Sequence, residues 1–313
     1  MTRGFVTIST GNEYYYKLAT NLLMSYRYNS KNPLPFAILS DKKNKYTDLF
    51  DNVVIIEKPA HSFMDKFSLL KICPYDENIF IDADSLAFGD LNVLWNLFKD
   101  ATDFSAIGYN SGLYEQGGGL QYNVEGIGKY GKLIKYKTWV HAGVMFIRNA
   151  PSLEKFYNDC MEILKDYDKL EILSSRGSYD EVTFAIAMPM NNYLTVPEKT
   201  EIFAFRPYIK SIIADIVKGK LSYKHPIKNM SVDNGVLLHF TTAETRKPFY
   251  IHQVEKLKRK LKGDSVNFID RYKASQFNKY YLNTRYFFQS NLNCILSLPK
   301  RAIGRLRRLV SNS

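Results

Sequence analysis

The run Ile79-Phe80-Ile81-Asp82-Ala83-Asp84 decides the fold. Its first three residues are β-branched or aromatic, which predicts a buried strand. Two carboxylates follow where that strand ends, and residues two apart in an extended chain point the same way. Ligands of open α/β sheets bind at the carboxyl ends of the strands. Two oxygen ligands there suit Mg²⁺ or Mn²⁺, although Asp-x-Asp after a strand is also typical of a turn or a helix cap.

The chain around this run alternates strand and helix patterns. Strands are predicted over 5–9, 35–39, 51–57, 103–108, 140–147 and 236–240, the third of them as a buried strand. Helices are predicted over 14–29, 63–72, 91–98, 151–165 and 180–188. Residues 110–132 contain seven glycines among polar residues and predict a long loop, a length that usually means function or disorder. The order of elements predicts an α/β fold whose sheet is mostly parallel.

The charge of the chain is concentrated near its end. Residues 256–313 hold 14 Lys and Arg against 2 Asp and Glu, whereas residues 1–255 hold 29 of each kind. A neutral body argues against nucleic-acid binding, which needs a basic face. Over 291–310 apolar residues fall near one helical face and basic residues on the rest, which predicts an amphipathic helix on an anionic membrane. A helical hairpin that packs on the body is the alternative.

Other features of the sequence indicate the compartment. Met1-Thr2-Arg3-Gly4 leads directly into a strand pattern without a secretory signal, and no apolar run approaches the ~20 residues of a membrane span. Cys73, Cys160 and Cys294 lie far apart, without the spacing of a metal site. We therefore expect reduced thiols in a cytoplasmic protein.

Separated motifs over about residues 4–250 resemble the retaining sugar-nucleotide glycosyltransferases of glycosyltransferase family eight, which include glycogenin and bacterial lipopolysaccharide galactosyl- and glucosyltransferases. They are Thr7–Tyr16, Lys66-Phe67, Asp82-Ala83-Asp84, His141-Ala142-Gly143-Val144, Asp180-Glu181, and His239-Phe240 with Lys247-Pro248-Phe249. The resemblance implies a single-domain nucleotide-diphospho-sugar transferase fold (GT-A type) with a mixed central sheet. That catalytic domain would cover residues 1–255, and a basic, aromatic-rich helical extension for membrane attachment would cover 256–313.

The resemblance implies a role for each matching residue. Asp82, Asp84 and His239 would bind Mn²⁺ (or Mg²⁺) together with the donor's diphosphate; the softer imidazole ligand favours Mn²⁺. Lys247 would lie on the diphosphate and balance the charge of the leaving group. The residues implied to hold the uracil, the ribose and the donor sugar are Thr7, Ser9, Thr10, Asn12, Tyr15, Lys66, Asp82, Ala83, His141 and Ala142.

Asp180 and Glu181 are the catalytic candidates. When the sugar–phosphate bond breaks, the oxocarbenium-like sugar needs a polar or negative group on its other face. Glu181 stands where the lipopolysaccharide galactosyltransferases carry Gln, and a covalent intermediate and a front-face attack both remain open. Acidic residues also favour the first turn of a helix, so a cap is the alternative role.

Three departures from the family's pattern bear on the identity of the sugar. His141-Ala142-Gly143 replaces Asn-x-Gly, the spacing from His239 to Lys247 is longer and lacks a glycine, and Lys-Pro-Phe replaces Lys-Pro-Trp. The glycine-rich residues 110–132 would form a lid that excludes water. Tyr114, Gln116 and Tyr122 of that lid could meet an acceptor; a surface insertion is the alternative.

We therefore expect a metal-dependent, retaining hexosyltransferase that moves a hexose from a UDP-sugar to an acceptor hydroxyl of a cell-surface glycan, of lipopolysaccharide or capsule type. It would work in the cytoplasm, peripherally on the inner face of the cell membrane, with a glycan or glycolipid acceptor and no nucleic acid. The alternatives are an inverting glycosyltransferase of the same fold, with Asp180 as its base, and a non-catalytic membrane- or nucleic-acid-binding adaptor.

Overall fold

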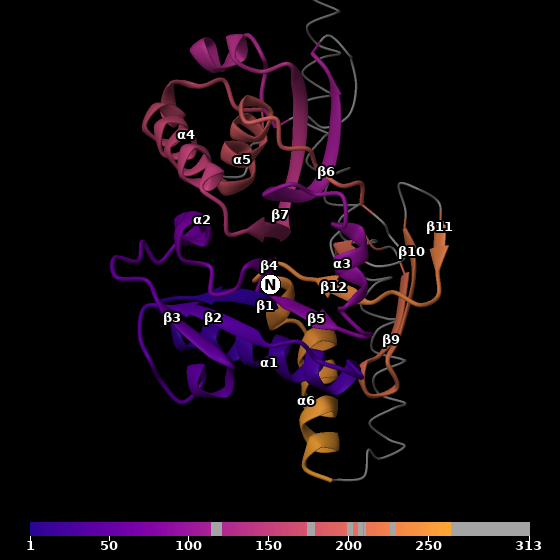
Figure 1. Cartoon of the computed structure of the whole chain (residues 1–313). Coiled ribbons are helices and arrows are strands. Elements are labelled where there is room, and N and C mark those ends of the chain that lie inside the picture. Colours follow the sequence, from indigo (N-terminus) through magenta and orange to yellow (C-terminus); the bar gives the residue numbers. More distant parts are fainter. Residues whose placement is uncertain are drawn as a thin grey trace, which may run out of the picture.

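The structure is a computed structural model of the chain (Figure 1), which describes residues 1–113, 121–173, 179–198, 203–205, 209, 211–225 and 230–263. A six-stranded sheet of order β3-β2-β1-β4-β7-β6 forms its centre. Its strands are β1 (Arg3–Ser9), β2 (Phe36–Ser40), β3 (Asn52–Ile55), β4 (Glu77–Ile81), β6 (Phe104–Gly112) and β7 (Tyr136–Arg148). Only β7 runs against its neighbours, which confirms the α/β prediction with a mixed sheet.

Helices cover both faces of this sheet (Figure 1). They are α1 (Glu13–Asn29), α2 (Leu69–Ile72), α3 (Val93–Leu97), α4 (Ser152–Asp166) and α5 (Tyr179–Met190). Side chains alternate between the two cores, as the period of a strand requires. Phe5 and Ile79 pack in the core beneath α1 and α3, whereas Val6 and Phe80 pack in the core beneath α4 and α5. The parallel strands of this sheet are buried on both faces, which explains the continuous apolar runs in the sequence.

Two small sheets and a terminal helix complete the described fold. One sheet has the order β5-β12-β8 and the other β11-β10-β9. Their strands are β5 (Ser85–Ala87), β8 (Phe203–Phe205), β9 (Ser211–Asp215), β10 (Lys220–His225), β11 (Met230–Val232) and β12 (Leu237–His239). Helix α6 (Pro248–Leu261) begins with its proline at the first turn, where no backbone N–H is needed. Among the described residues, no helix has the length and apolar character needed to cross a membrane.

The sheet is mostly parallel, as expected, and β7 alone returns antiparallel between β4 and β6. Two local predictions were wrong. The third strand is an edge strand that pairs only with β2 in this sheet, and Ile55 is 41% exposed. The helix expected over 63–72 is a 3₁₀ helix (Phe63–Ser68) followed by the single turn α2. There the Asp65 carboxylate accepts N–H of Ala60 and the hydroxyl of Thr10, contacts that compete with a regular helix.

The described residues of the glycine-rich segment include a strand and buried core residues rather than one loop. Strand β6 continues to Gly112, and Tyr122, Ile127 and Tyr130 are buried. The Tyr122 hydroxyl donates to the carbonyl oxygen of Ala185 (3.3 Å), so this side chain supports α5 instead of facing an acceptor. Tyr114 and Gln116, and with them the centre of the expected lid, lie outside the described residues.

The expected domain boundary after residue 255 falls inside α6. Val254 and Leu257 of this helix are buried in the apolar cluster that also contains Leu221 of β10 and Leu238 of β12. The first basic residues of the extension therefore belong to the folded body. Residues 264–313 lie outside the described residues, and the membrane-attachment segment stays a prediction.

Strands β6 and β7 extend beyond the carboxyl end of β4. Strand β4 ends at Ile81, opposite Val144, whereas β6 and β7 continue to pair from Ile107–His141 as far as Gly112–Tyr136. We call the segments 107–112 and 136–141 the β6–β7 arm. Figure 1 shows both strands rising past the rest of the sheet. The arm therefore projects past the sheet edge where the Asp82–Asp84 turn lies.

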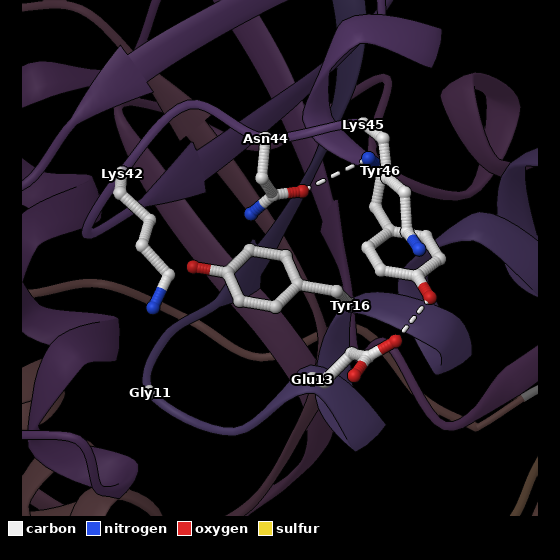
Figure 2. Close-up of a pocket in the computed structure, with 7 residues that line it drawn as sticks. All are labelled: Gly11, Glu13, Tyr16, Lys42, Asn44, Lys45 and Tyr46. Carbon is white, nitrogen blue, oxygen red and sulfur yellow. Dashed lines mark hydrogen bonds between the residues drawn. The ribbon is translucent and has the colours of Figure 1, made fainter.

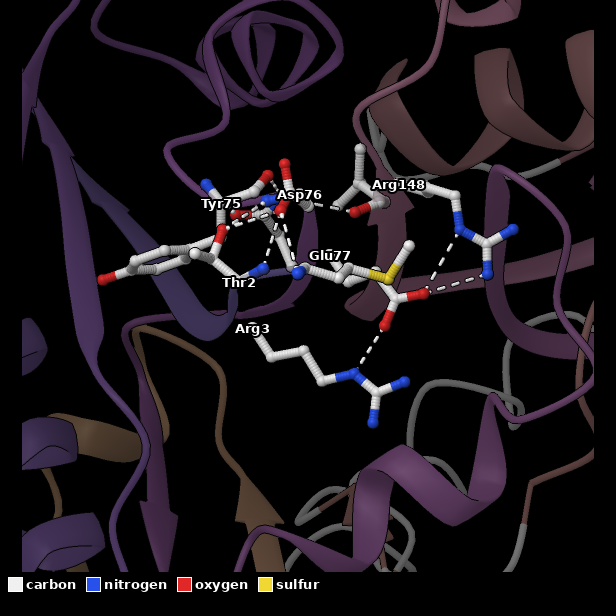
Figure 3. A network of polar contacts seen from close by, with 9 residues as sticks. Thr2, Arg3, Tyr75, Asp76, Glu77 and Arg148 are labelled. Atoms are coloured by element: carbon white, nitrogen blue, oxygen red, sulfur yellow. Dashed lines mark hydrogen bonds and ion pairs between the residues drawn. The ribbon is translucent and has the colours of Figure 1, made fainter.

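The opposite end of the sheet is held by a buried carboxylate. Arg3, Glu77 and Arg148 stand directly across from one another on β1, β4 and β7. Glu77 is 3% exposed and accepts from Arg3 Nε at 2.6 Å and from Arg148 Nη2 at 3.0 Å (Figure 3). Burial alone would raise the pKa of Glu77, but the guanidinium groups of Arg148 and Arg3 outweigh it and lower that pKa below its ordinary 4.5.

We predict that Glu77→Gln lowers the free energy of unfolding by about 1–2 kcal/mol at pH 7, because both arginines are partly exposed and their pairs are screened. Since the folded pKa is the lower one, the stabilisation is present above pH 4.5 and is lost as the pH falls through the folded pKa. Urea unfolding at pH 7 and pH 3, with Glu57→Gln on the surface as the control, measures this. A deficit that is equal at both pH values would contradict it.

Candidate functional site

The site begins where β4 ends. The backbone N–H of Asp82 donates to the carbonyl oxygen of Gly143 (2.9 Å), which continues the β4–β7 ladder by one step. A turn follows, closed by the N–H of Ser85 on the carbonyl of Asp82 (3.1 Å), and β5 starts there. The two carboxylates face the same side, as expected, although through a turn rather than an extended strand.

His239 reaches both aspartates because β12 pairs with β5. The antiparallel register sets His239 opposite Ser85, and the N–H of Phe240 donates to the carbonyl of Asp84 (3.0 Å). His239 Nε2 lies 3.0 Å from Asp84 Oδ1 and 3.5 Å from Asp82 Oδ2. One ligand atom from each of the three residues lies within 4.8 Å of the others. The structure thus brings together the three residues that the sequence predicted as metal ligands.

Gly143 leaves the space that His239 occupies. A Cβ on Gly143 would lie 2.6 Å from His239 Nδ1 and 2.6 Å from His141 Cε1. The pairing of β6 with β7 shifts register between Ala106 and Ile107, opposite this part of β7. Such irregularities re-aim side chains and are common beside active sites. Here the N–H of Gly143 donates to His141 Nδ1 (3.0 Å), and the His141 and His239 rings meet edge to face at 5.0 Å.

Lys66 is clamped between two aspartates beside the cluster. Its ammonium lies 3.0 Å from Asp82 Oδ1 and 2.8 Å from Asp180 Oδ2, and it donates to the carbonyl of Ala142 (3.3 Å). Burial would lower the pKa of Lys66, but the carboxylates of Asp180 and Asp82 outweigh it and raise the pKa, so the group stays charged. Phe67 beside it packs on α5 with ring centroids 4.9 Å apart from Phe184, which fixes the two elements together.

Glu181 lies at the first turn of α5, next to Asp180. Its carboxylate accepts the N–H of Ala142 (3.3 Å) on β7. Burial, reinforced by the charge of Asp180, raises the pKa of Glu181 to about 7. Burial also raises the pKa of Asp82, in spite of Lys66 and His239 nearby. Carboxylates whose pKa is raised by burial are typical of functional sites.

The charge balance of the cluster favours a cation. The carboxylates of Asp82 and Asp180 pair with the ammonium of Lys66, and Asp84 lies against His239. Burial would lower the pKa of His239, but the carboxylates of Asp84 and Asp82 outweigh it and raise that pKa. Burial lowers the pKa of His141 well below its ordinary value, with His239 adding to the effect, so this ring stays neutral. Two carboxylates and one imidazole are a donor set that Mn²⁺ accepts, and Mg²⁺ accepts the oxygens. These residues therefore fit a divalent metal ion.

The residues expected to hold the nucleotide lie at the carboxyl end of β1, beside β4 in the sheet. Asn12 caps α1 by accepting the N–H of Tyr14, Thr10 donates to Asp65, and Tyr15 is 42% exposed. Thr7 and Ser9 are buried, and their hydroxyls have no hydrogen-bond partner among the described residues.

A cavity of about 450 Å³ lies next to this turn, and Figure 2 shows the residues that line it. It is lined by Gly11, Glu13, Tyr16, Lys42, Asn44, Lys45 and Tyr46. The Tyr16 and Tyr46 rings lie nearly parallel, with an interplanar angle of 15°, and the Tyr46 hydroxyl donates to Glu13. The cavity thus joins the ends of β1 and β2 and continues the edge on which the metal-ligand cluster lies.

Lys247 and Ala83 are two further residues that the sequence predicted for the donor site. Lys247 precedes α6, where its ammonium pairs with Glu244, and Ala83 lies partly buried in the turn between the two aspartates. The sequence reasoning missed Asp65, which is 3% exposed and fixes Thr10. A carboxylate immediately before Lys66 was the available signal. Small residues inside a strand, here Ala142 and Gly143, predict a close approach, and the packing of His239 requires Gly143.

Comparisons with known proteins give structural similarity alone. No protein-family model matches the chain, and no curated protein matches it. The galactosyltransferase LgtC, solved with donor and acceptor sugar analogs, has 13% identity, covers 86% of this chain and 99% of its own, and gives a TM-score of 0.45. The glycosyltransferase GlyE of Streptococcus pneumoniae has 13% identity. The match covers 64% of this chain and 46% of GlyE, with a TM-score of 0.43.

The bifunctional glycosyltransferase WbbM has 16% identity, with 65% of this chain and 40% of its own covered and a TM-score of 0.42. The chain therefore spans less than half the length of WbbM and GlyE.

We predict that Gly143→Ala displaces His239, because the new methyl group would overlap the imidazole. The expected cost is about 1–3 kcal/mol of unfolding free energy, typical of overpacking, together with weakened Mn²⁺ binding. Thermal unfolding with and without Mn²⁺ measures both effects. Gly89→Ala is the matched control, since its Cβ would lie 3.4 Å from Val236, in ordinary contact. Unchanged stability and an unchanged Mn²⁺ shift in Gly143→Ala would show that the glycine is not needed.

Proposed function

We propose that this protein is a metal-dependent glycosyltransferase of the family-eight type, which transfers a hexose from a UDP-sugar with retention of configuration. The observation that carries the proposal is the cluster of Asp82, Asp84 and His239 at the carboxyl edge of the sheet. It joins ligands from two motifs 155 residues apart in the chain, in the arrangement that the sequence resemblance implied. An adaptor that uses the aspartates only as turns would not need a buried imidazole against them.

The topology supports a nucleotide across this edge. Strand β1 lies between β2 and β4, and the chain leaves β1 toward β2 and β3 before it returns to β4 on the other side. Ligands of open α/β sheets bind at such a switch point, outside the carboxyl ends of the strands. The UDP would extend from Thr10 and Asn12 at the end of β1 to the aspartates at the end of β4.

The chemistry requires charge on the leaving side. When the bond between the anomeric carbon and the phosphate oxygen breaks, UDP leaves with concentrated negative charge. A Mn²⁺ held by Asp82, Asp84 and His239 would supply Lewis-acid stabilisation of that charge when bound. Lys247 would add a second positive charge. Lys66 holds the Asp82 carboxylate in place through its 3.0 Å contact and so orients one of the ligands.

Glu181 would act on the donor sugar. Its carboxylate lies against the β7 backbone at Ala142, on the segment that the resemblance assigns to the donor sugar. A partly buried carboxylate there, in its ionised form, would stabilise the positive charge of the transition state. Asp180 is 2% exposed and committed to Lys66, which disfavours it as the acceptor base of an inverting enzyme.

The acceptor and the location complete the proposal. We take the acceptor to be a glycan or glycolipid at the cytoplasmic face of the membrane, with the basic extension as the attachment. Arg259, Lys260 and Lys262 at the end of α6 are exposed and are among the described basic residues of that extension.

We predict transfer or hydrolysis of UDP-glucose or UDP-galactose that requires Mn²⁺ and stops with EDTA. Asp84→Asn should lower kcat/KM by about 10³-fold, because it removes a ligand from the charge-stabilising ion. Release of UDP and the anomeric configuration of the product, measured by NMR, test this. The surface variant Asp100→Asn should behave as wild type. Metal-independent turnover would contradict the metal site, and an inverted product would establish the inverting alternative.

We predict that the full chain binds vesicles containing phosphatidylserine at low salt and leaves them in 0.5 M NaCl. Each basic residue near an anionic surface contributes about 1 kcal/mol, so replacing Lys300, Arg301, Arg305, Arg307 and Arg308 with Gln should weaken binding at least about a hundredfold. Sedimentation with vesicles measures it, and Lys132→Gln with Lys135→Gln is the control. If the extension variant binds the vesicles as strongly as the control variant, the extension does not attach the protein to the membrane.

A further inference from the structure

A continuous series of rings leads from the metal-ligand cluster onto the β6–β7 arm. His239 meets His141 with ring centroids 5.0 Å apart, and His141 meets Trp139 at 6.3 Å. Trp139 stacks on Tyr109 at 5.6 Å with an interplanar angle of 13°. Trp139 and His141 are two apart on one strand, so the series follows one face of β7.

The Tyr109–Trp139 pair is built into the arm and partly open to solvent. The two residues stand directly opposite each other on β6 and β7, which sets their rings on the same face of the arm. Tyr109 is 37% exposed and Trp139 is half-buried, so parts of both rings remain accessible. On the other edge of β6, Gly108 donates its N–H to the carbonyl of Val196 (2.8 Å), which anchors the strand.

We propose that Tyr109 and Trp139 form the acceptor subsite, on which the acceptor's pyranose ring stacks. This inference rests on the proposed function. If the diphosphate lies at His239 and the donor hexose at His141, the next position along the ring series is Trp139. The acceptor hydroxyl must lie next to the donor's anomeric carbon, so we place the acceptor at this next position.

The chemistry of the pair suits a sugar ring. One face of many pyranoses presents C–H groups, which bury apolar surface against an aromatic ring and meet the negative face of its π system. The two nearly parallel rings stack on each other, so each holds the other in place and the sugar would pack on the part of the pair that stays exposed. Stacking contacts the C–H face of the sugar ring and does not depend on single hydroxyl groups. The subsite would therefore select a pyranose ring over an acyclic polyol.

The chain contains two tryptophans, which gives a direct test. Trp95 packs against Phe5 and Phe146 in the core of the body, and Trp95→Phe leaves Trp139 as the sole indole. In this variant, with UDP and Mn²⁺ present, methyl β-glucopyranoside, methyl β-galactopyranoside, lactose and maltose are titrated while indole emission is recorded. We expect a saturable change with at least one pyranoside and none with sorbitol.

Tyr109→Ala in the same background should weaken that pyranoside's affinity about tenfold, as expected for the loss of one stacking face. NMR saturation transfer to the sugar, in Trp139→Leu and Tyr109→Ala, gives a readout that does not depend on indole emission. Tyr157→Ala is the matched control, an aromatic on α4 whose ring Lys71 covers at 4.4 Å.

Calorimetric binding of UDP with Mn²⁺, measured on the same samples, separates this proposal from the proposed function. Intact UDP binding without any pyranoside response, or with equal sugar affinity in Tyr109→Ala, overturns the subsite and leaves the glycosyltransferase standing. A pyranoside response that Tyr109→Ala weakens supports the platform. If that response occurs without UDP binding, the platform holds as a carbohydrate site and the donor proposal fails.

Discussion

The ammonium of Lys66 is the contact on which the site depends. It bridges Asp82 at the end of β4 and Asp180 at the start of α5, and it bonds to the β7 carbonyl of Ala142. Three segments far apart in the sequence are thereby fixed within one buried network. Removing one charge from such a network leaves the others uncompensated, which is costly. The network thus holds the carboxylates together in a place where they would otherwise repel one another.

A divalent ion is the physical complement of this arrangement. The ammonium pairs with Asp82 and Asp180, and Asp82 and Asp84 lie beside His239 at the carboxyl edge of the sheet. His239 completes a mixed oxygen and nitrogen donor set from a separate small sheet, so the ligands depend on the β5–β12 pairing as well as on the central sheet. The metal site therefore forms only when both sheets are folded.

The sequence predicted the parts that follow local rules. The buried strand before Asp82, the helices α1, α4 and α5, and the three ligands were all indicated by apolar periodicity or by motif residues. What it did not predict comes from tertiary contacts. The 3₁₀ helix around Lys66 follows from Asp65 bonding to Thr10, and the burial of Tyr122 follows from α5. Such contacts join residues more than 50 positions apart and leave no local pattern.

The most direct test of the metal site is calorimetric titration of UDP, with and without Mn²⁺, into the wild type and into His239→Ala. We predict that UDP binds the wild type only with Mn²⁺, and that His239→Ala weakens this binding at least about tenfold, as expected when a ligand of a metal site is lost. His252→Ala, on α6, serves as the control. UDP binding that is equal with and without Mn²⁺, or unchanged in His239→Ala, would contradict a metal site formed by Asp82, Asp84 and His239.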